Sequence, residues 1–185
     1  AAETTGLLSA AAALAEKSGA KLAWIPRRAG ERGALEAGAI GTLLPGGRPV
    51  ADAAARVDIA TVWGVPTIPA NVGRTTSEII ESLGNGSLDA VVVGGVDPQD
   101  MPNSAAALAA LSKSFVVSLE IAHSAVTNVA DVVLPVAAIT EKSGSFLNWE
   151  GRARAFDAAV ADSLNRSDHV SYTHLRAHET VLDLV

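Results

Sequence analysis

The stretch Asp89-Ala-Val-Val-Val-Gly-Gly-Val-Asp-Pro98 decides the fold. Residues 89–93 predict a strand buried on both faces of a parallel sheet, because the residues after Asp89 form a short, continuously apolar run of mostly β-branched side chains. Gly94 and Gly95 follow at its carboxyl end, where open α/β sheets bind their ligands. These glycines are compatible with a tight strand-to-helix turn and equally with the close approach of a phosphate.

Similar runs recur along the chain and alternate with alanine-rich helical patterns. The predicted strands are residues 21–25, 89–93, 115–119 and 131–134. The predicted helices are residues 7–18, 52–63, 75–83, 104–112 and 121–126, with Asp52 as an N-cap and a Thr75–Glu78 capping box. Residues 26–49 are expected to be a loop, and a hairpin or domain exit is expected from Gly144. This alternation predicts an α/β fold with a parallel sheet and helices on both faces.

Composition excludes several classes of protein. The net charge of −6, with acidic and basic residues interspersed, argues against a nucleic-acid binder. No uncharged apolar run approaches the ~20 residues that span a bilayer. Cysteine is absent, so this stretch holds neither disulfides nor a cysteine-ligated iron–sulfur cluster. Any redox centre must come from elsewhere in a parent protein.

No catalytic constellation is evident in the sequence. The G-x-G-x-x-G and Walker motifs are missing, so a dinucleotide fingerprint is lacking. His123 is interpreted as a structural group in a short helix near Glu120, and Arg27-Arg28 as a solvated pair. His174 and His178 have the spacing of zinc ligands, but they lie in a tail that does not read as native protein. We therefore predict no catalytic residue and no metal site.

That tail is residues 170–185, which resembles the translation of a sequencing adapter rather than protein. We exclude it from fold reasoning. Because the chain begins without Met and enters a helical pattern almost at once, we expect an internal fragment that is incomplete at both ends. Residues 1–155 are assigned to one α/β domain and residues 156–169 to an exit segment.

Four motifs within residues 88–155 resemble the molybdopterin oxidoreductase superfamily in order and spacing. They are Gly94-Gly-Val-Asp-Pro98, Phe115-Val-Val-Ser-Leu119, Ala130-Asp-Val-Val-Leu-Pro135 and Thr140-Glu-Lys-Ser-Gly-Ser-Phe-Leu-Asn-Trp-Glu-Gly-Arg152. Upstream, residues 32–38 and Pro45-Gly46 resemble a formate dehydrogenase segment that runs beside the pterin. The resemblance implies a Rossmann-like domain. The pterin-side positions that it implies are Gly94, Gly95, Asp97, Arg32, Gly33, Asn148, Glu150 and Arg152.

The departures from this pattern indicate a particular branch. Ala29-Gly30, Gly41 and Gly47 stand where the pattern has asparagines, a proline and a tyrosine. Together with Trp149, this resembles the family of the large iron–sulfur subunit of respiratory complex I, the NADH-quinone oxidoreductase, in its actinobacterial form. In that family this domain is vestigial, so the cofactor positions above are expected to be empty remnants.

The resemblance also implies the surroundings of the segment. The parent would carry 4Fe–4S and 2Fe–2S clusters, contact other complex I subunits, and bind no nucleic acid. It would lie peripherally on the cytoplasmic side of the plasma membrane, attached only through the complex. Two alternatives stay open: a working molybdenum enzyme such as a formate dehydrogenase, with molybdopterin bound, and a nucleotide-binding module.

Overall fold

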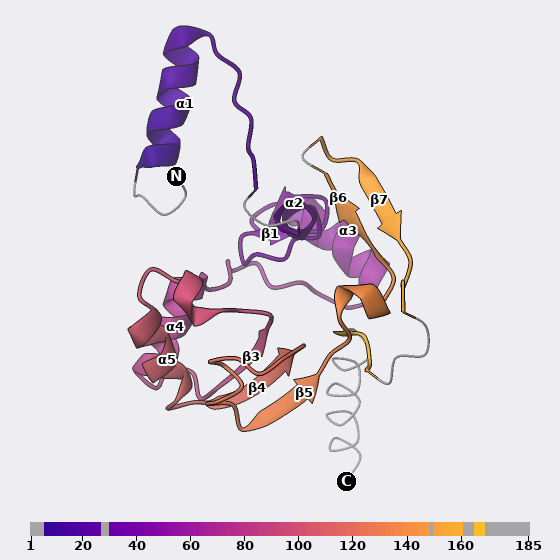
Figure 1. The fold of residues 1–185 in the computed structure, drawn as a ribbon. Helices are drawn as coiled ribbons and strands as arrows, with labels where there is room; N and C mark the ends of the chain where they lie inside the picture. The colour runs from indigo at the N-terminus through magenta and orange to yellow at the C-terminus, as the bar shows by residue number, and fades with distance from the viewer. Residues whose placement is uncertain (1–5, 27–29, 149, 161–164, 169–185) are drawn as a thin grey trace.

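The computed structural model, which describes residues 6–26, 30–148, 150–160 and 165–168, contains a three-stranded parallel sheet. Its strand order is β3-β4-β5 (Figure 1). The strands are β3 (Ala90–Gly94), β4 (Phe115–Glu120) and β5 (Val132–Pro135). Val92 lies opposite Val117, and Val117 lies opposite Val132. The predicted parallel sheet and these three strands are therefore confirmed.

Two helices cover one face of this sheet. They are α4 (Thr76–Gly84) and α5 (Ser104–Leu111), which pack against each other. The core beneath them consists of Leu83, Ala110, Leu111, Val116 and Val126. The small side chain of Ala110 lets α5 approach its neighbours closely, and the predicted helices at residues 75–83 and 104–112 are confirmed.

The expectation that β3 is buried on both faces was wrong. Its burial alternates along the strand, and Val92 is 53% exposed. Val91 and Val93 point to the other face and pack against the core. β3 is an edge strand, and α4 and α5 pack only on the face of Val91 and Val93. An apolar run cannot show whether both of its faces are covered, because that depends on the neighbours.

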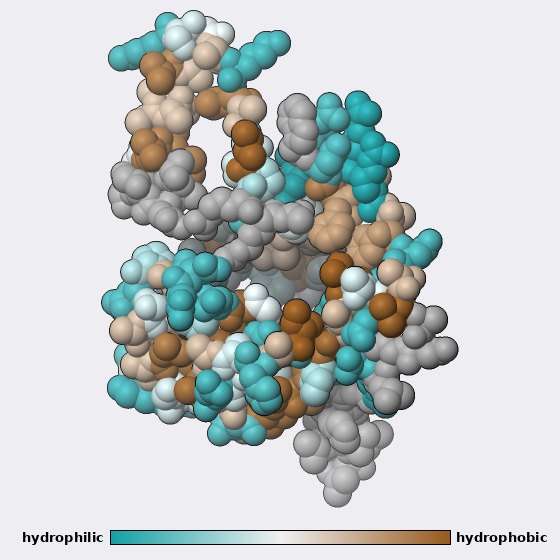
Figure 2. All heavy atoms as spheres, in the orientation of Figure 1, coloured by the Kyte–Doolittle hydropathy of each residue, from teal (hydrophilic) through white to brown (hydrophobic). Residues whose placement is uncertain are grey.

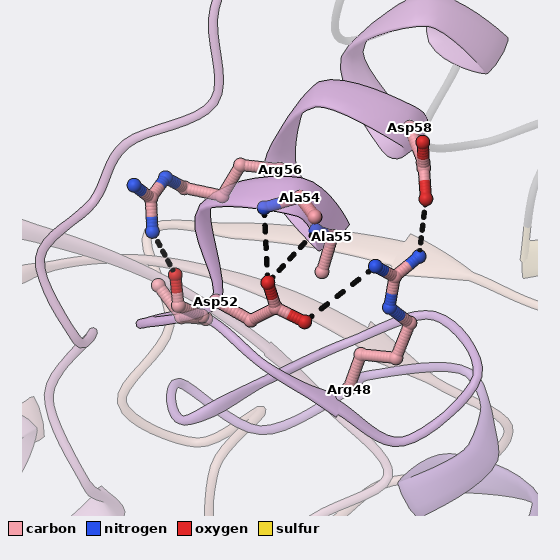
Figure 3. Close-up of polar contacts among 7 residues, drawn as sticks. Arg48, Asp52, Ala54, Ala55, Arg56 and Asp58 are labelled. Carbon is pink, nitrogen blue, oxygen red and sulfur yellow. Dashed lines mark hydrogen bonds and ion pairs between the residues drawn. The ribbon is translucent and has the colours of Figure 1, made fainter.

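Two helix starts are determined by local side chains, as predicted. The Asp52 carboxylate accepts hydrogen bonds from the N–H groups of Ala54 (2.9 Å) and Ala55 (3.3 Å) at the start of α3 (Ala53–Trp63) (Figure 3). These two bonds, and the nearby guanidinium of Arg48, lower the pKa of Asp52. The capping box at α4 is also confirmed, and the Thr75 N–H lowers the pKa of Glu78 in the same way.

Residues 26–49 were expected to be a loop, and that expectation was wrong in part. The segment contains α2 (Glu31–Glu36) and a small antiparallel pair, β1 (Leu43–Leu44) and β2 (Arg48–Pro49). A second core of Leu44, Val50 and Ala55 holds this pair against α3. Arg48 links them further, because its guanidinium bonds Asp58 at 2.7 Å and contacts Asp52 at 3.5 Å (Figure 3).

Two predicted elements are absent from the described residues. Residues 21–25 are not a strand, since no neighbouring strand pairs with them in the described structure. Residues 121–126 are not a helix, because bends and irregular backbone at residues 121–124 lead into a turn at residues 125–129. There the Ser124 and Thr127 side chains bond nearby backbone groups, which competes with helical hydrogen bonds. By contrast, α1 (Leu7–Ser18) forms as predicted and ends at Gly19, whose φ is 69°.

The hairpin predicted after Gly144 is confirmed. β6 (Gly144–Leu147) pairs antiparallel with β7 (Ala153–Phe156). The rings of Phe146 and Phe156 stack with centroids 5.1 Å apart. A Cβ on Gly144 would lie 2.8 Å from the Phe156 ring, so a larger residue there would require the ring to shift. No helix among the described residues is long and apolar enough to cross a membrane.

The Asp52 cap allows a first test. We expect Asp52→Ala to speed amide exchange in α3 about fivefold at pH 7, because two helix N–H groups lose their acceptor. The lowered pKa means that the carboxylate stabilises the helix fully above its ordinary pKa of 3.8, and that this contribution is lost as pH falls through the folded-state value. The difference from wild type should therefore vanish well below pH 3.8, as measured by hydrogen exchange. Asp58→Ala, which removes only an exposed ion pair, is the control; an equal effect of both would contradict the cap.

Candidate functional site

The carboxyl ends of the three parallel strands open into a cavity of about 760 Å³. The turn after β3 forms one wall with Gly94, Gly95 and Asp97, as the sequence predicted for its position. Other lining residues come from the ends of β4 and β5 and from later segments: Leu119, Glu120, His123, Val136, Lys142 and Asp168. The arrangement follows the general rule that α/β sheets place their ligand crevice at this edge.

Two polar groups of the glycine turn bond within the protein. The Gly95 N–H donates to the Leu119 carbonyl at 3.2 Å, and the φ of Gly95 is +59°. The Asp97 carboxylate accepts the Gln99 N–H at 2.9 Å and so caps the short helix η1 (Pro98–Asp100). Of the two interpretations of these glycines, the geometry supports the tight turn, because the Gly95 N–H already has a carbonyl acceptor.

The charged side chains of the cavity are mostly acidic. Asp97, Glu120 and Asp168 contribute carboxylates, whereas Lys142 contributes an ammonium group that pairs with Asp168. His123 lies in the lining, not in the helix expected for it. The described residues contain no group of three or more His, Cys, Asp or Glu side chains that could hold a metal ion.

The remaining predicted site residues lie at a different place, in the turn between β6 and β7 and in α2. Asn148 organises that turn: its side-chain oxygen accepts the N–H groups of Glu150 (3.0 Å) and Arg152 (2.8 Å). Glu150 and Arg152 also form an ion pair at 3.2 Å. Gly151 supplies the left-handed conformation of the turn, with φ +81°. The motif around Asn148 therefore builds its own hairpin turn.

α2 packs against β6 and brings Arg32 next to this turn. The Arg32 guanidinium bonds Glu36 at 2.6 Å, and its Nη2 would lie 3.6 Å from a Cβ on Gly151. Its Nε is buried and has no partner within the described structure. Gly33 lies in the same helix, in open space. Arg32 thus lies beside the hairpin turn at Gly151.

The predicted site residues therefore fall into two groups, one at the sheet edge and one at the hairpin turn. Sequence reasoning missed the roles of Glu120, Lys142 and Asp168 in the cavity. Lys142 belongs to a motif recognised in the sequence. Asp168 lies far from that motif in the sequence and reaches the cavity only because its segment folds back toward it. Predictions for Arg27, Arg28, Trp149 and the tail with His174 and His178 lie outside the described residues.

Comparison with known proteins identifies the family. The sequence model of the family "Molybdopterin oxidoreductase" matches residues 3–167. The chain belongs to this family. It is 54% identical over 168 residues to the G subunit of NADH-quinone oxidoreductase from Mycobacterium bovis, covering 89% of this chain and 21% of that protein. The corresponding protein of Streptomyces coelicolor is 53% identical over 160 residues, covering 86% and 19%.

A more distant relative is formate dehydrogenase H of Escherichia coli, 31% identical over 134 residues, which cover 70% of this chain and 18% of that protein. The chain thus spans about a fifth of the length of each of these relatives. The predicted assignment to the NADH-quinone oxidoreductase branch of the molybdopterin oxidoreductases is confirmed.

The described residues that line the cavity do not fit the pterin cofactor of the family. Molybdopterin carries phosphate, which needs cations or free N–H groups around it. Three carboxylates and one lysine line the cavity, and that lysine already forms an ion pair with Asp168. The Gly95 N–H donates to Leu119, as described above. A bound anion would therefore meet net negative charge.

The structural role of Gly151 in the hairpin turn can be tested by substitution. Gly151→Ala places a Cβ at φ +81°, and we expect a loss of about 1–2 kcal/mol in the stability of the β6–β7 hairpin. Gly33→Ala is the matched control, since it lies in α2 with nothing within 4 Å and should stabilise the helix by up to about 1 kcal/mol. Amide exchange in β6 and β7 measures both. Equal effects of the two substitutions would contradict the role of Gly151.

Proposed function

We propose that this chain is a non-catalytic, structural segment of the G subunit of an NADH-quinone oxidoreductase. The identity of 54% over 89% of the chain supports this assignment. The non-catalytic part of the proposal is supported by one observation: the motif side chains form hydrogen bonds to backbone groups of the chain itself. Asp97 caps η1, and Asn148 holds a hairpin turn through two backbone N–H groups. Side chains bonded in this way stabilise the scaffold itself, which supports a structural role.

A third motif side chain has the same kind of role. The Asp131 carboxylate accepts the N–H of Val116 at 2.7 Å, and the Asp131 N–H donates to the Val116 carbonyl at 2.9 Å. Asp131 thereby ties the start of β5 to β4. The motif Ala130-Asp-Val-Val-Leu-Pro135 thus has a structural explanation that requires no cofactor.

The wider role of the parent is part of the proposal. Its iron–sulfur clusters would lie outside this cysteine-free stretch and pass electrons from NADH toward quinone, while this segment supplies scaffold and contacts to other subunits. The complex would be membrane-attached, with this subunit on the cytoplasmic side. Residues 1–155 would form the family domain, and residues 156–169 would form the exit segment.

The second candidate is a molybdenum enzyme of the formate dehydrogenase kind. The buried Nε of Arg32, which has no partner in the described structure, is the observation that favours it, because a guanidinium binds anions well. A nucleotide-binding module is a third option, supported only by the position of the cavity at the sheet edge.

Metal analysis of the purified full-length subunit separates these candidates. We expect iron but no stoichiometric molybdenum or tungsten, because the cavity residues disfavour a phosphate-bearing pterin. About one molybdenum per chain, together with extractable pterin, would overturn the structural assignment. Saturable binding of a nucleotide would support the third candidate, and binding that is lost in Lys142→Gln would place the nucleotide at this cavity.

A further inference from the structure

α1 and the extended residues after it stand apart from the sheet and its helices (Figure 1). Figure 2 shows brown, apolar residues on this separate lobe. None of the α1 residues in the described structure is buried, and Leu7, Leu8 and Leu14 are 42%, 62% and 66% exposed. Isolated helices of this length are marginal in water, because starting a helix is costly. The apolar face of α1 therefore lacks the packing that would stabilise it.

Residues 21–25 have the composition of a buried strand but no strand partner in the described structure. In an extended chain, Leu22 and Trp24 point to one face and Ala23 and Ile25 to the other. Leu22, Trp24 and Ile25 are 65%, 45% and 82% exposed. Apolar side chains on both faces are typical of strands in parallel sheets, which are covered on both sides.

The order of the two elements indicates the kind of sheet. α1 ends at Gly19, whose left-handed conformation stops the helix before the extended segment begins. The order of a helix followed directly by an extended segment matches the second half of a βαβ unit, which joins parallel strands. One side of α1 carries Leu7, Ala11 and Leu14, and this side would pack on the sheet.

We propose that α1 and residues 21–25 form a docking element, which adds one strand and its covering helix to a parallel sheet elsewhere in the parent subunit. This inference rests on the proposed function. The sheet that receives this element is expected in the rest of the parent subunit, because the aligned region covers only 21% of the Mycobacterium bovis protein. A second copy of the chain is the competing occupant.

Hydrogen exchange provides the first test. In the full-length subunit, the amides of residues 22–25 should exchange about 100-fold more slowly, or slower still, than in this chain alone, because strand pairing protects them. Equal rates in the two proteins would overturn the proposal. The same protection in the isolated chain, appearing only on dimerisation, would make a second copy the partner and would also overturn it.

A matched pair of substitutions tests the orientation of α1. Ala11→Lys and Ala13→Lys introduce the same side chain on opposite faces of the helix, and both alanines are exposed in this structure. In the full-length subunit, Ala11→Lys should speed exchange at residues 22–25 about tenfold or more, whereas Ala13→Lys should leave it unchanged. Equal behaviour of the two variants would contradict docking through the Leu7–Leu14 face. Molybdenum in the parent would overturn the proposed function without altering this exchange pattern.

Discussion

The pairing of Asp131 with Val116 fixes the part of the molecule on which the candidate site depends. Two hydrogen bonds, 2.7 and 2.9 Å, join these residues one position ahead of the first β4–β5 pair, Val117 and Val132. Val116 is fully buried, so its N–H would otherwise lack an acceptor, at a cost of about 1–3 kcal/mol. Once this register is set, the carboxyl ends of the strands align and the cavity forms where they end.

Features determined by near neighbours in the chain could be predicted from the sequence. Asp52 bonds amides two and three residues away, and Thr75 and Glu78 bond each other, so local spacing was sufficient. Features determined by distant contacts could not be predicted. Residues 21–25 have a strand composition but no pairing strand within the described structure. The exposed face of Val92 depends on what covers the sheet, which no local pattern records.

The same distinction applies to the site. The glycine turn after β3 was predicted at the sheet edge, and Gly94, Gly95 and Asp97 do line the cavity there. Its charge was not predictable, because Lys142 and Asp168 are 26 residues apart and meet only in the folded chain. The residues at the end of the motif that ends at Arg152 bond one another within the turn of the β6–β7 hairpin. The bonds of Asn148, Glu150 and Arg152 within the turn therefore account for these motif positions in structural terms.

According to the proposed function, the motif residues of this segment stabilise a scaffold and do not bind a pterin. A cryo-electron microscopy map of the intact complex tests this most directly. We predict Lys142 paired with Asp168, the Gly95 N–H bonded to Leu119, and no phosphate-sized density in the cavity at the ends of β3, β4 and β5. Continuous density for a pterin dinucleotide in contact with Gly95 and Asp97 would contradict it.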